Sequence, residues 1–224
     1  MLGRQIMMAA GLAMITSCVA ADQRYLPQTS PAAVRQLSAM RMVMPIFSQI
    51  LLAPRPSGFN MVYENTQGRQ YISEMVPAGE NAKRWTKMFT ISGARDLAAN
   101  PNLTPQIFAN GMAAGFKHMC PYSFSALGVS ANRIDGYEAF TLILSCGVSQ
   151  AAPAPRSEAA LISVIKGERD YFTLQWAERG APSSRPVPID FGKWSEKYQK
   201  LAMVRLCCRI PGEAAPYPSC ISRP

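Results

Sequence analysis

Apolar and polar positions alternate along much of this chain, with the short period that predicts β-strands. The pattern predicts strands at 50–52, 59–64, 70–76, 85–91, 137–146, 159–166 and 171–176. The turn Gly167-Glu168-Arg169-Asp170 joins the last two strands, which therefore form an antiparallel hairpin. A second hairpin is predicted around the turn at 65–68.

A second pattern, with apolar residues about one helical turn apart, predicts three helices. They are predicted at 34–44, at 104–120 and from the cap Asp190 through Cys207. Pro45 ends the first helix, and Pro105 suits the first position of the second, which Asn102 or Thr104 can cap.

The order of these elements predicts an α+β fold, an antiparallel β-sheet packed against helices. A chain of 224 residues is long enough for one good core with accessory segments. We therefore expect a single α+β domain at 46–209, preceded by a linker and short helix at 22–45. A proline-rich tail follows at 210–224.

The first residues predict export. Arg4 precedes an uncharged apolar stretch from Ile6 to Ile15, and small residues follow, as in a secretory signal peptide. The stretch is shorter than the roughly 20 residues that a membrane-spanning helix needs. Residues 1–21 are therefore expected to be a signal peptide.

Two cleavage sites compete. Cleavage after Ala21 releases a chain that begins at Asp22, whereas Ile15-Thr16-Ser17-Cys18 resembles a bacterial lipobox. In the second alternative the signal ends at Ser17 and Cys18 carries lipid, which would anchor the protein to a membrane. Val19 after the cysteine then favours the outer membrane.

Six cysteines in an exported chain predict disulfides. A bridge from Cys120 to Cys146 would tie a helix to a strand, and its loop of about 26 residues should stabilise the fold by roughly 3 kcal/mol. Cys220 can pair with Cys207 or Cys208, and Cys208–Cys220 is the disulfide that we predict. One cysteine of the adjacent pair is then expected to stay a buried free thiol.

The formal net charge of +9 comes from scattered basic residues. A dispersed positive charge suits contact with anionic lipid, and equally suits solubility. Nucleic-acid binding would need a basic stripe interleaved with exposed aromatic residues, and none is present in the sequence. We therefore expect no nucleic-acid partner.

Candidate catalytic groups do not form a recognisable motif. His118, the only histidine, lies two residues from Cys120, a spacing that points the two side chains apart on a helix. The carboxylates that could form an acid–base pair are Glu74, Glu80, Glu138, Glu158 and Asp170. Zinc-binding spacing is absent. The sequence thus predicts no enzyme, no cofactor and no metal site.

One candidate binding face is suggested by aromatic and basic residues around the last predicted strand. Its residues are Arg169, Tyr171, Trp176 and Arg179. If the aromatic rings were exposed beside the two arginines, they would mark a surface for a partner.

Several short sequence segments resemble those of a group of uncharacterised bacterial envelope proteins. They are 71–80, Trp85-Thr86-Lys87-Met88-Phe89-Thr90, 136–140, 144–146 and 164–175. The order of elements is similar to the fold of PsbP-like proteins and DcrB-type lipoproteins. This resemblance implies a compact α/β sandwich with an accessory or assembly role, and it brings no set of functional residues.

We therefore expect a non-catalytic exported envelope protein in the bacterial periplasm. It would have a binding or assembly role, and Cys18 would anchor it to the outer membrane in the lipoprotein alternative. Its expected partners are the membrane and an unidentified envelope protein. The alternatives are a hydrolase of envelope polymers that uses carboxylates, and a subunit of a secretion or outer-membrane complex.

Overall fold

The computed structural model describes residues 41–149 and 154–222. The predicted signal segment with Cys18, and the linker up to residue 40, lie outside the described residues. Within the part that is described, no helix has the length and apolar character needed to cross a membrane.

The larger of two sheets has seven antiparallel strands in the order β3-β4-β5-β9-β8-β7-β6. Their bounds are β3 Phe59–Gln67, β4 Gln70–Pro77, β5 Lys87–Ala94, β6 Phe124–Ile134, β7 Tyr137–Ser149, β8 Arg156–Lys166 and β9 Tyr171–Gly180. Both predicted hairpins are confirmed, as β3–β4 and β8–β9. The predicted antiparallel sheet is therefore present, and wider than expected, because β6 was not predicted.

The smaller sheet corrects two predicted helices. It consists of β1 Arg41–Ile46, β2 Gln49–Pro54 and β10 Arg205–Cys208 in the order β1-β2-β10. The described end of the predicted helix 34–44 is thus a strand, in which Met42, Met44 and Ile46 are buried at every second position. Pro45 is tolerated there because β1 is an edge strand. The small sheet therefore already includes Arg41, whereas the sequence predicted that the domain begins at residue 46.

In the described residues, three α-helices accompany the sheets. They are α2 Pro105–Met119, α3 Phe191–Ala202 and α4 Pro218–Ile221, with a 3₁₀ turn at Leu97–Ala99. Thr104 caps α2 by accepting a hydrogen bond from the Ile107 N–H, as expected. Asp190 caps α3, but that helix ends at Ala202 and not at Cys207, because the following residues pair with β2.

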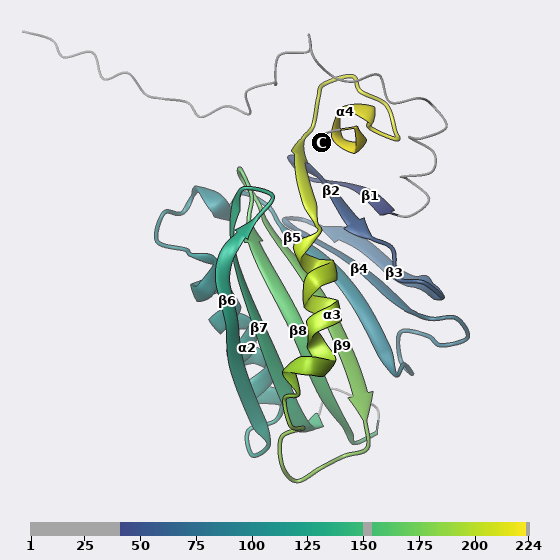
Figure 1. Ribbon diagram of the computed structural model, residues 1–224, viewed down its shortest axis with the longest axis vertical. Coiled ribbons are helices and arrows are strands. Elements are labelled where there is room, and N and C mark those ends of the chain that lie inside the picture. Colours follow the sequence, from purple (N-terminus) through teal and green to yellow (C-terminus); the bar gives the residue numbers. More distant parts are fainter. Residues whose placement is uncertain (1–40, 150–153, 223–224) are drawn as a thin grey trace, which may run out of the picture.

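The large sheet is covered on both faces (Figure 1). In β8, Leu161 and Ile165 point into a core shared with α3 and the small sheet. The alternate residues Ile162 and Val164 point into a second core beneath α2. This alternation explains why nine consecutive residues of β8 are buried. The fold is therefore a sheet with helices on both faces, in agreement with the predicted α+β class.

The β1–β2 turn docks on the β8–β9 turn. Asp170, only 1% exposed, accepts hydrogen bonds from the Ser48 N–H at 3.0 Å, from the Ser48 hydroxyl at 2.5 Å and from the Asp96 N–H at 2.8 Å. Beside it, the fully buried Gln49 accepts a hydrogen bond from the Glu168 N–H and donates one to Tyr137. This network joins the small sheet to the large one.

A substitution at Gly167 tests how closely the β1–β2 and β8–β9 turns are packed. A Cβ atom at Gly167 would overlap Gln49 Oε1 and the Phe172 ring. We expect Gly167→Ala to lower the free energy of unfolding by about 2 kcal/mol in urea titrations. The control is Gly111→Ala in α2, where a Cβ meets nothing within 4 Å and alanine should raise stability by up to about 1 kcal/mol. Equal effects of both changes would contradict the close contact.

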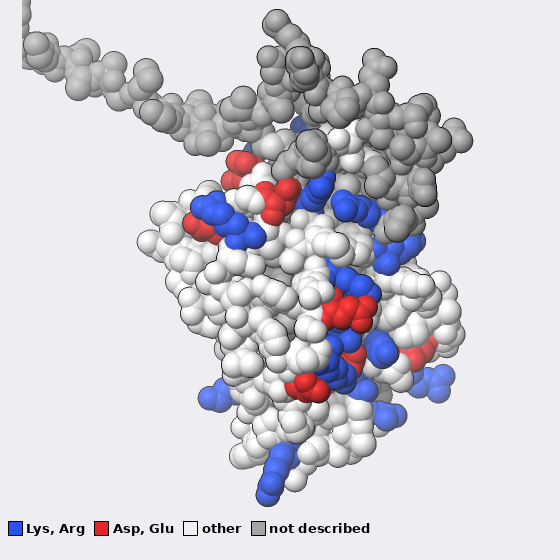
Figure 2. All heavy atoms as spheres, viewed as in Figure 1, with Lys and Arg blue, Asp and Glu red and all other residues white. Residues whose placement is uncertain are grey.

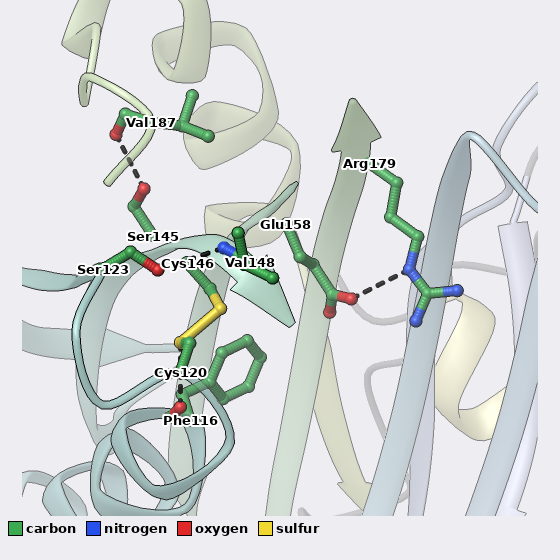
Figure 3. The surroundings of a disulfide bond; sticks show 9 residues. All are labelled: Phe116, Cys120, Ser123, Ser145, Cys146, Val148, Glu158, Arg179 and Val187. Carbon is green, nitrogen blue, oxygen red and sulfur yellow. Dashed lines mark hydrogen bonds and ion pairs between the residues drawn. A yellow bond between two sulfur atoms is a disulfide. The ribbon is translucent and has the colours of Figure 1, made fainter. Parts of the chain in front are cut away.

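Two disulfides between described residues fasten the periphery. Cys120 at the end of α2 bridges to Cys146 of β7, with 5.9 Å between the Cα atoms, which confirms the predicted link of helix to sheet (Figure 3). Cys220 pairs with Cys207, so the assignment of Cys208 to this bridge was wrong. Cys207 and Cys220 are both buried in the small core that β2 forms with α4, which positions them for each other. None of the described cysteines is free, which also corrects the expected leftover thiol.

Candidate binding site

A pocket of about 450 Å³ lies at one end of the large sheet. It is built from the loop between β4 and β5, the first residue of β8 and the end of β9. The lining residues are Gly79, Glu80, Asn81, Lys83, Arg84, Trp85, Thr86, Ala154, Arg156 and Arg179. Its volume falls in the range of about 300–1,000 Å³ that is typical of small-molecule sites.

Arg179 and Trp85 form the wall of this pocket. The guanidinium carbon of Arg179 lies 3.7 Å from the centre of the Trp85 ring, a cation–π contact. Arg179 Nε donates a hydrogen bond of 2.9 Å to Glu158 on the neighbouring strand β8 (Figure 3). The arginine is therefore held on two sides, by a ring and by a carboxylate.

The β4–β5 loop is fixed by its own side chains. Asn81 Oδ1 accepts hydrogen bonds from the N–H groups of Lys83 and Arg84, both at 3.0 Å. The two Glu80 carboxylate oxygens accept from the N–H and the hydroxyl of Thr86, both at 2.7 Å. These local bonds hold the basic residues of the loop at the pocket without using their charged groups.

Positive charge in the pocket is only partly neutralised. Lys83, Arg84 and Arg156 are exposed, and no ion pair to any of them occurs within 41–149 and 154–222. Among the described lining residues Glu80 is the only carboxylate, and its oxygens already accept hydrogen bonds from Thr86. The pocket therefore presents donors and positive charge to an incoming ligand.

Two carboxylates near Arg179 have raised pKa values. Burial raises the pKa of Glu158, and the charge and hydrogen bond of Arg179 only partly offset this effect. Burial also raises the pKa of Glu74, again with partial compensation by Arg179. Arg179 thus lowers the pKa of both carboxyl groups relative to the effect of burial alone.

The face around α3 shows the opposite arrangement, with acidic and basic side chains interspersed (Figure 2). Glu178 accepts ion pairs from Lys193 at 2.7 Å and Lys197 at 3.1 Å. Burial acts to raise the pKa of Glu178, but the hydrogen bonds from the two lysines outweigh it and lower the pKa. The charges on this face satisfy one another, so it is a weaker candidate for binding an ion.

A second pocket lies beside the β1–β2 and β8–β9 turns, and its charged groups also pair with groups of the same pocket. It is lined by Phe47, Ser48, Arg95, Asp96, Arg169 and Asp170. Arg169 pairs with Asp96 at 3.0 Å, and the Arg95 guanidinium lies over the Phe47 ring at 4.4 Å. Its groups hold the two sheets together.

The four residues of the sequence-derived binding face are not brought together. Arg169 lies in the turn before β9 and Arg179 near the end of that strand, so roughly the length of the strand, about 30 Å, separates them. Tyr171 is fully buried in the core beneath α2, and its hydroxyl donates to the Leu103 carbonyl. Trp176 packs into the other core, against Phe59. Only Arg179 belongs to the pocket.

The other candidate residues are dispersed. His118 is exposed in the last turn of α2, while Cys120 is bonded to Cys146. Of the candidate carboxylates, Asp170 is part of the turn network and Glu80 is part of the pocket loop. No cluster of three or more potential metal ligands occurs in the described part of the chain.

Lys83, Arg84 and Arg156 line the pocket but were not predicted as site residues from the sequence. A weak signal was present, because Lys83 and Arg84 directly precede Trp85 in a loop that begins at Gly79. Arg156 could not be placed beside them, since it enters the pocket only through the pairing of β8 with β9.

Comparison with known proteins gives fold-level similarity alone. No family model and no curated protein matches the sequence. Among solved structures, LpqN, involved in cell envelope biogenesis of Mycobacterium tuberculosis, is 14% identical with a TM-score of 0.42, over 81% of this chain and 99% of LpqN. The Ran-binding protein Mog1p of Saccharomyces cerevisiae is 7% identical with a TM-score of 0.39, over 71% of this chain and 83% of its own.

A protein of unknown function from Pseudomonas aeruginosa, described as a putative regulator, is 11% identical with a TM-score of 0.37. The match covers 78% of this chain and 99% of the other. At such scores the likeness carries no argument about the site.

Proposed function

We propose that this chain is an exported, non-catalytic binding protein of the bacterial cell envelope, and that it binds its ligand in the pocket of Trp85 and Arg179. The observation that carries this proposal is the preformed pocket, in which Arg179 stacks on Trp85 and three further basic residues, which form no ion pair with the described part of the chain, line the same wall. Such a pocket supplies binding contacts, and its only lining carboxylate is engaged with Thr86.

The export part of the proposal has separate support. The two disulfides Cys120–Cys146 and Cys207–Cys220 suit an oxidising compartment outside the cytoplasm. The apolar segment at the start of the sequence has the length and flanks of a signal peptide. A PsbP-like or DcrB-like fold is part of the same proposal, supported by the antiparallel sheet with helices on both faces.

Lipid attachment at Cys18 is the proposed anchor, and labelling tests it. In cells given a palmitate analogue, the wild-type chain should carry label and Cys18→Ala should carry none. His118→Ala is the control, because His118 is exposed on α2 and carries no thiol, so its loss should not affect acylation. Equal labelling of wild type and Cys18→Ala would remove the lipoprotein from the proposal, leaving the soluble periplasmic form.

An assembly role with an envelope partner is a second part of the proposal. The basic groups of the pocket, which form no ion pair with the described residues, favour a partner or ligand with negative charge. Crosslinking in intact cells, followed by purification from detergent extract, should recover a complex with the wild-type chain. The same complex should be depleted for Trp85→Ala; undiminished recovery would separate the pocket from any partner.

A further inference from the structure

We infer that the pocket of Trp85 and Arg179 binds a phosphate group carried by a small polar headgroup. This inference rests on the proposed binding function and specifies its ligand. It is drawn from three properties of the pocket, namely its charge, its donor geometry and its size.

The charge of the pocket fits a phosphomonoester better than a carboxylate. Lys83, Arg84 and Arg156 are exposed, and ion pairs to their charged groups are absent within 41–149 and 154–222. A phosphomonoester carries about −1.5 to −2 charges at neutral pH, so it can engage several of these cations at once. A single carboxylate would leave most of that positive charge without a counterion.

The donors also suit a phosphate. Arginine side chains present a planar fork that matches two oxygens of a phosphate, and lysine adds a point charge. Arg179 is held in place by its contact with Trp85 and its bond to Glu158, so little of its freedom remains to be lost on binding. The Asn81 and Glu80 contacts fix the loop that carries Lys83 and Arg84 in the same way.

The size of the pocket indicates that the ligand is more than an inorganic ion. About 450 Å³ is far more space than one phosphate fills, and Thr86 and Asn81 add polar atoms to the wall. A phosphate on a glycerol or sugar unit would fill this space and place its hydroxyls against these polar groups. Both a soluble phosphorylated compound and the headgroup of a phospholipid have this chemistry.

Calorimetry on the purified protein tests the inference with defined probes. Glycerol 3-phosphate should bind saturably, inorganic phosphate more weakly, and glycerol not at all. Arg156→Gln and Lys83→Gln should each weaken binding of glycerol 3-phosphate about tenfold, the loss expected for one charged contact. The matched control Arg133→Gln removes an exposed arginine near the end of β6, at the other end of the sheet, and should leave binding unchanged.

Vesicles distinguish the two sources of the phosphate. Phosphatidylcholine vesicles containing phosphatidic acid should retain the protein if the group is a lipid headgroup, and glycerol 3-phosphate should then compete. Retention that falls equally in Arg156→Gln and Arg133→Gln would overturn the inference, because it would show attraction by net charge alone.

The binding function and its ligand class can fail separately. If glycerol 3-phosphate does not bind but a neutral envelope glycan binds with sensitivity to Trp85→Ala, the phosphate inference is overturned and the pocket keeps its proposed binding role. If the wild-type chain crosslinks in cells to an envelope partner equally well with Trp85→Ala, and neither probe binds, both are overturned.

Discussion

Replacing Asp170 with alanine should lower the free energy of unfolding by about 4 kcal/mol. The carboxylate is buried and accepts three hydrogen bonds, two from Ser48 and one from Asp96. Alanine leaves these partly buried donors without their acceptor, and an unsatisfied buried donor costs about 1–3 kcal/mol. The contact joins the two sheets, so its loss weakens the packing of the whole small sheet.

Urea titration followed by circular dichroism measures this change. Asp190→Ala is a matched control, since Asp190 is exposed and accepts a single hydrogen bond from the Lys193 N–H, and it should cost about 1 kcal/mol. Asp170→Asn should lie between the two, because an amide offers one acceptor where the carboxylate offers two. A loss for Asp170→Ala no larger than that of the control would show that the two sheets do not depend on this carboxylate.

The sequence predicted those helices and strands whose signals lie within their own residues and the adjoining turns. The β8–β9 hairpin follows from two alternating segments around a four-residue turn, and α2 follows from Thr104, Pro105 and a regular apolar stripe. The Cys120–Cys146 bridge followed from the same assignments, because it links the end of that helix to a predicted strand.

The sequence did not predict the strands whose conformation depends on pairing with residues far away in the chain. Residues 205–208 continue the apolar spacing of α3, and only their pairing with β2 makes them a strand. Residues 41–44 combine helix-forming methionines with period-two burial, and the pairing of β1 with β2 decides between the two. β6 consists largely of small and polar residues, so its alternation is weak and β7 alone defines it.

The candidate site was missed for a related reason. The predicted binding face combined Arg169, Tyr171, Trp176 and Arg179 because they are close together in the sequence in and just before one strand. In a strand, however, neighbouring positions point to opposite faces and ten residues span its whole length. Arg179 instead meets Trp85 from a loop about ninety residues earlier, through the pairing of β5 with β9. A site assembled across strands in this way needs the sheet order, which the sequence does not contain.

Replacing Arg179 with methionine should cost about 3–5 kcal/mol of stability at pH 7, the second large effect that we expect. Its ion pair with Glu158 is nearly buried, with side-chain exposures of 14% and 11%. Methionine keeps much of the apolar contact with Trp85 but leaves the Glu158 carboxylate buried without a cation. Removing both charges in Arg179→Met/Glu158→Leu should restore most of the loss, because no uncompensated charge then remains.

The pH dependence separates this cause from a simple loss of packing. Burial already raises the pKa of Glu158 above its ordinary value, and without Arg179 that pKa should rise further. A carboxyl whose folded-state pKa lies above the unfolded value of about 4.3 destabilises the fold at higher pH, and protonation relieves this penalty as the pH falls. Urea titrations should therefore show that the difference in free energy of unfolding between wild type and Arg179→Met narrows from pH 7 to pH 5.

The control Lys193→Met leaves Glu178 paired with Lys197 and should cost less than about 1 kcal/mol. A gap that is constant across this range, with a double variant no more stable than Arg179→Met, would mean that Arg179 stabilises the fold by its contact with Trp85 and not by holding Glu158 ionised.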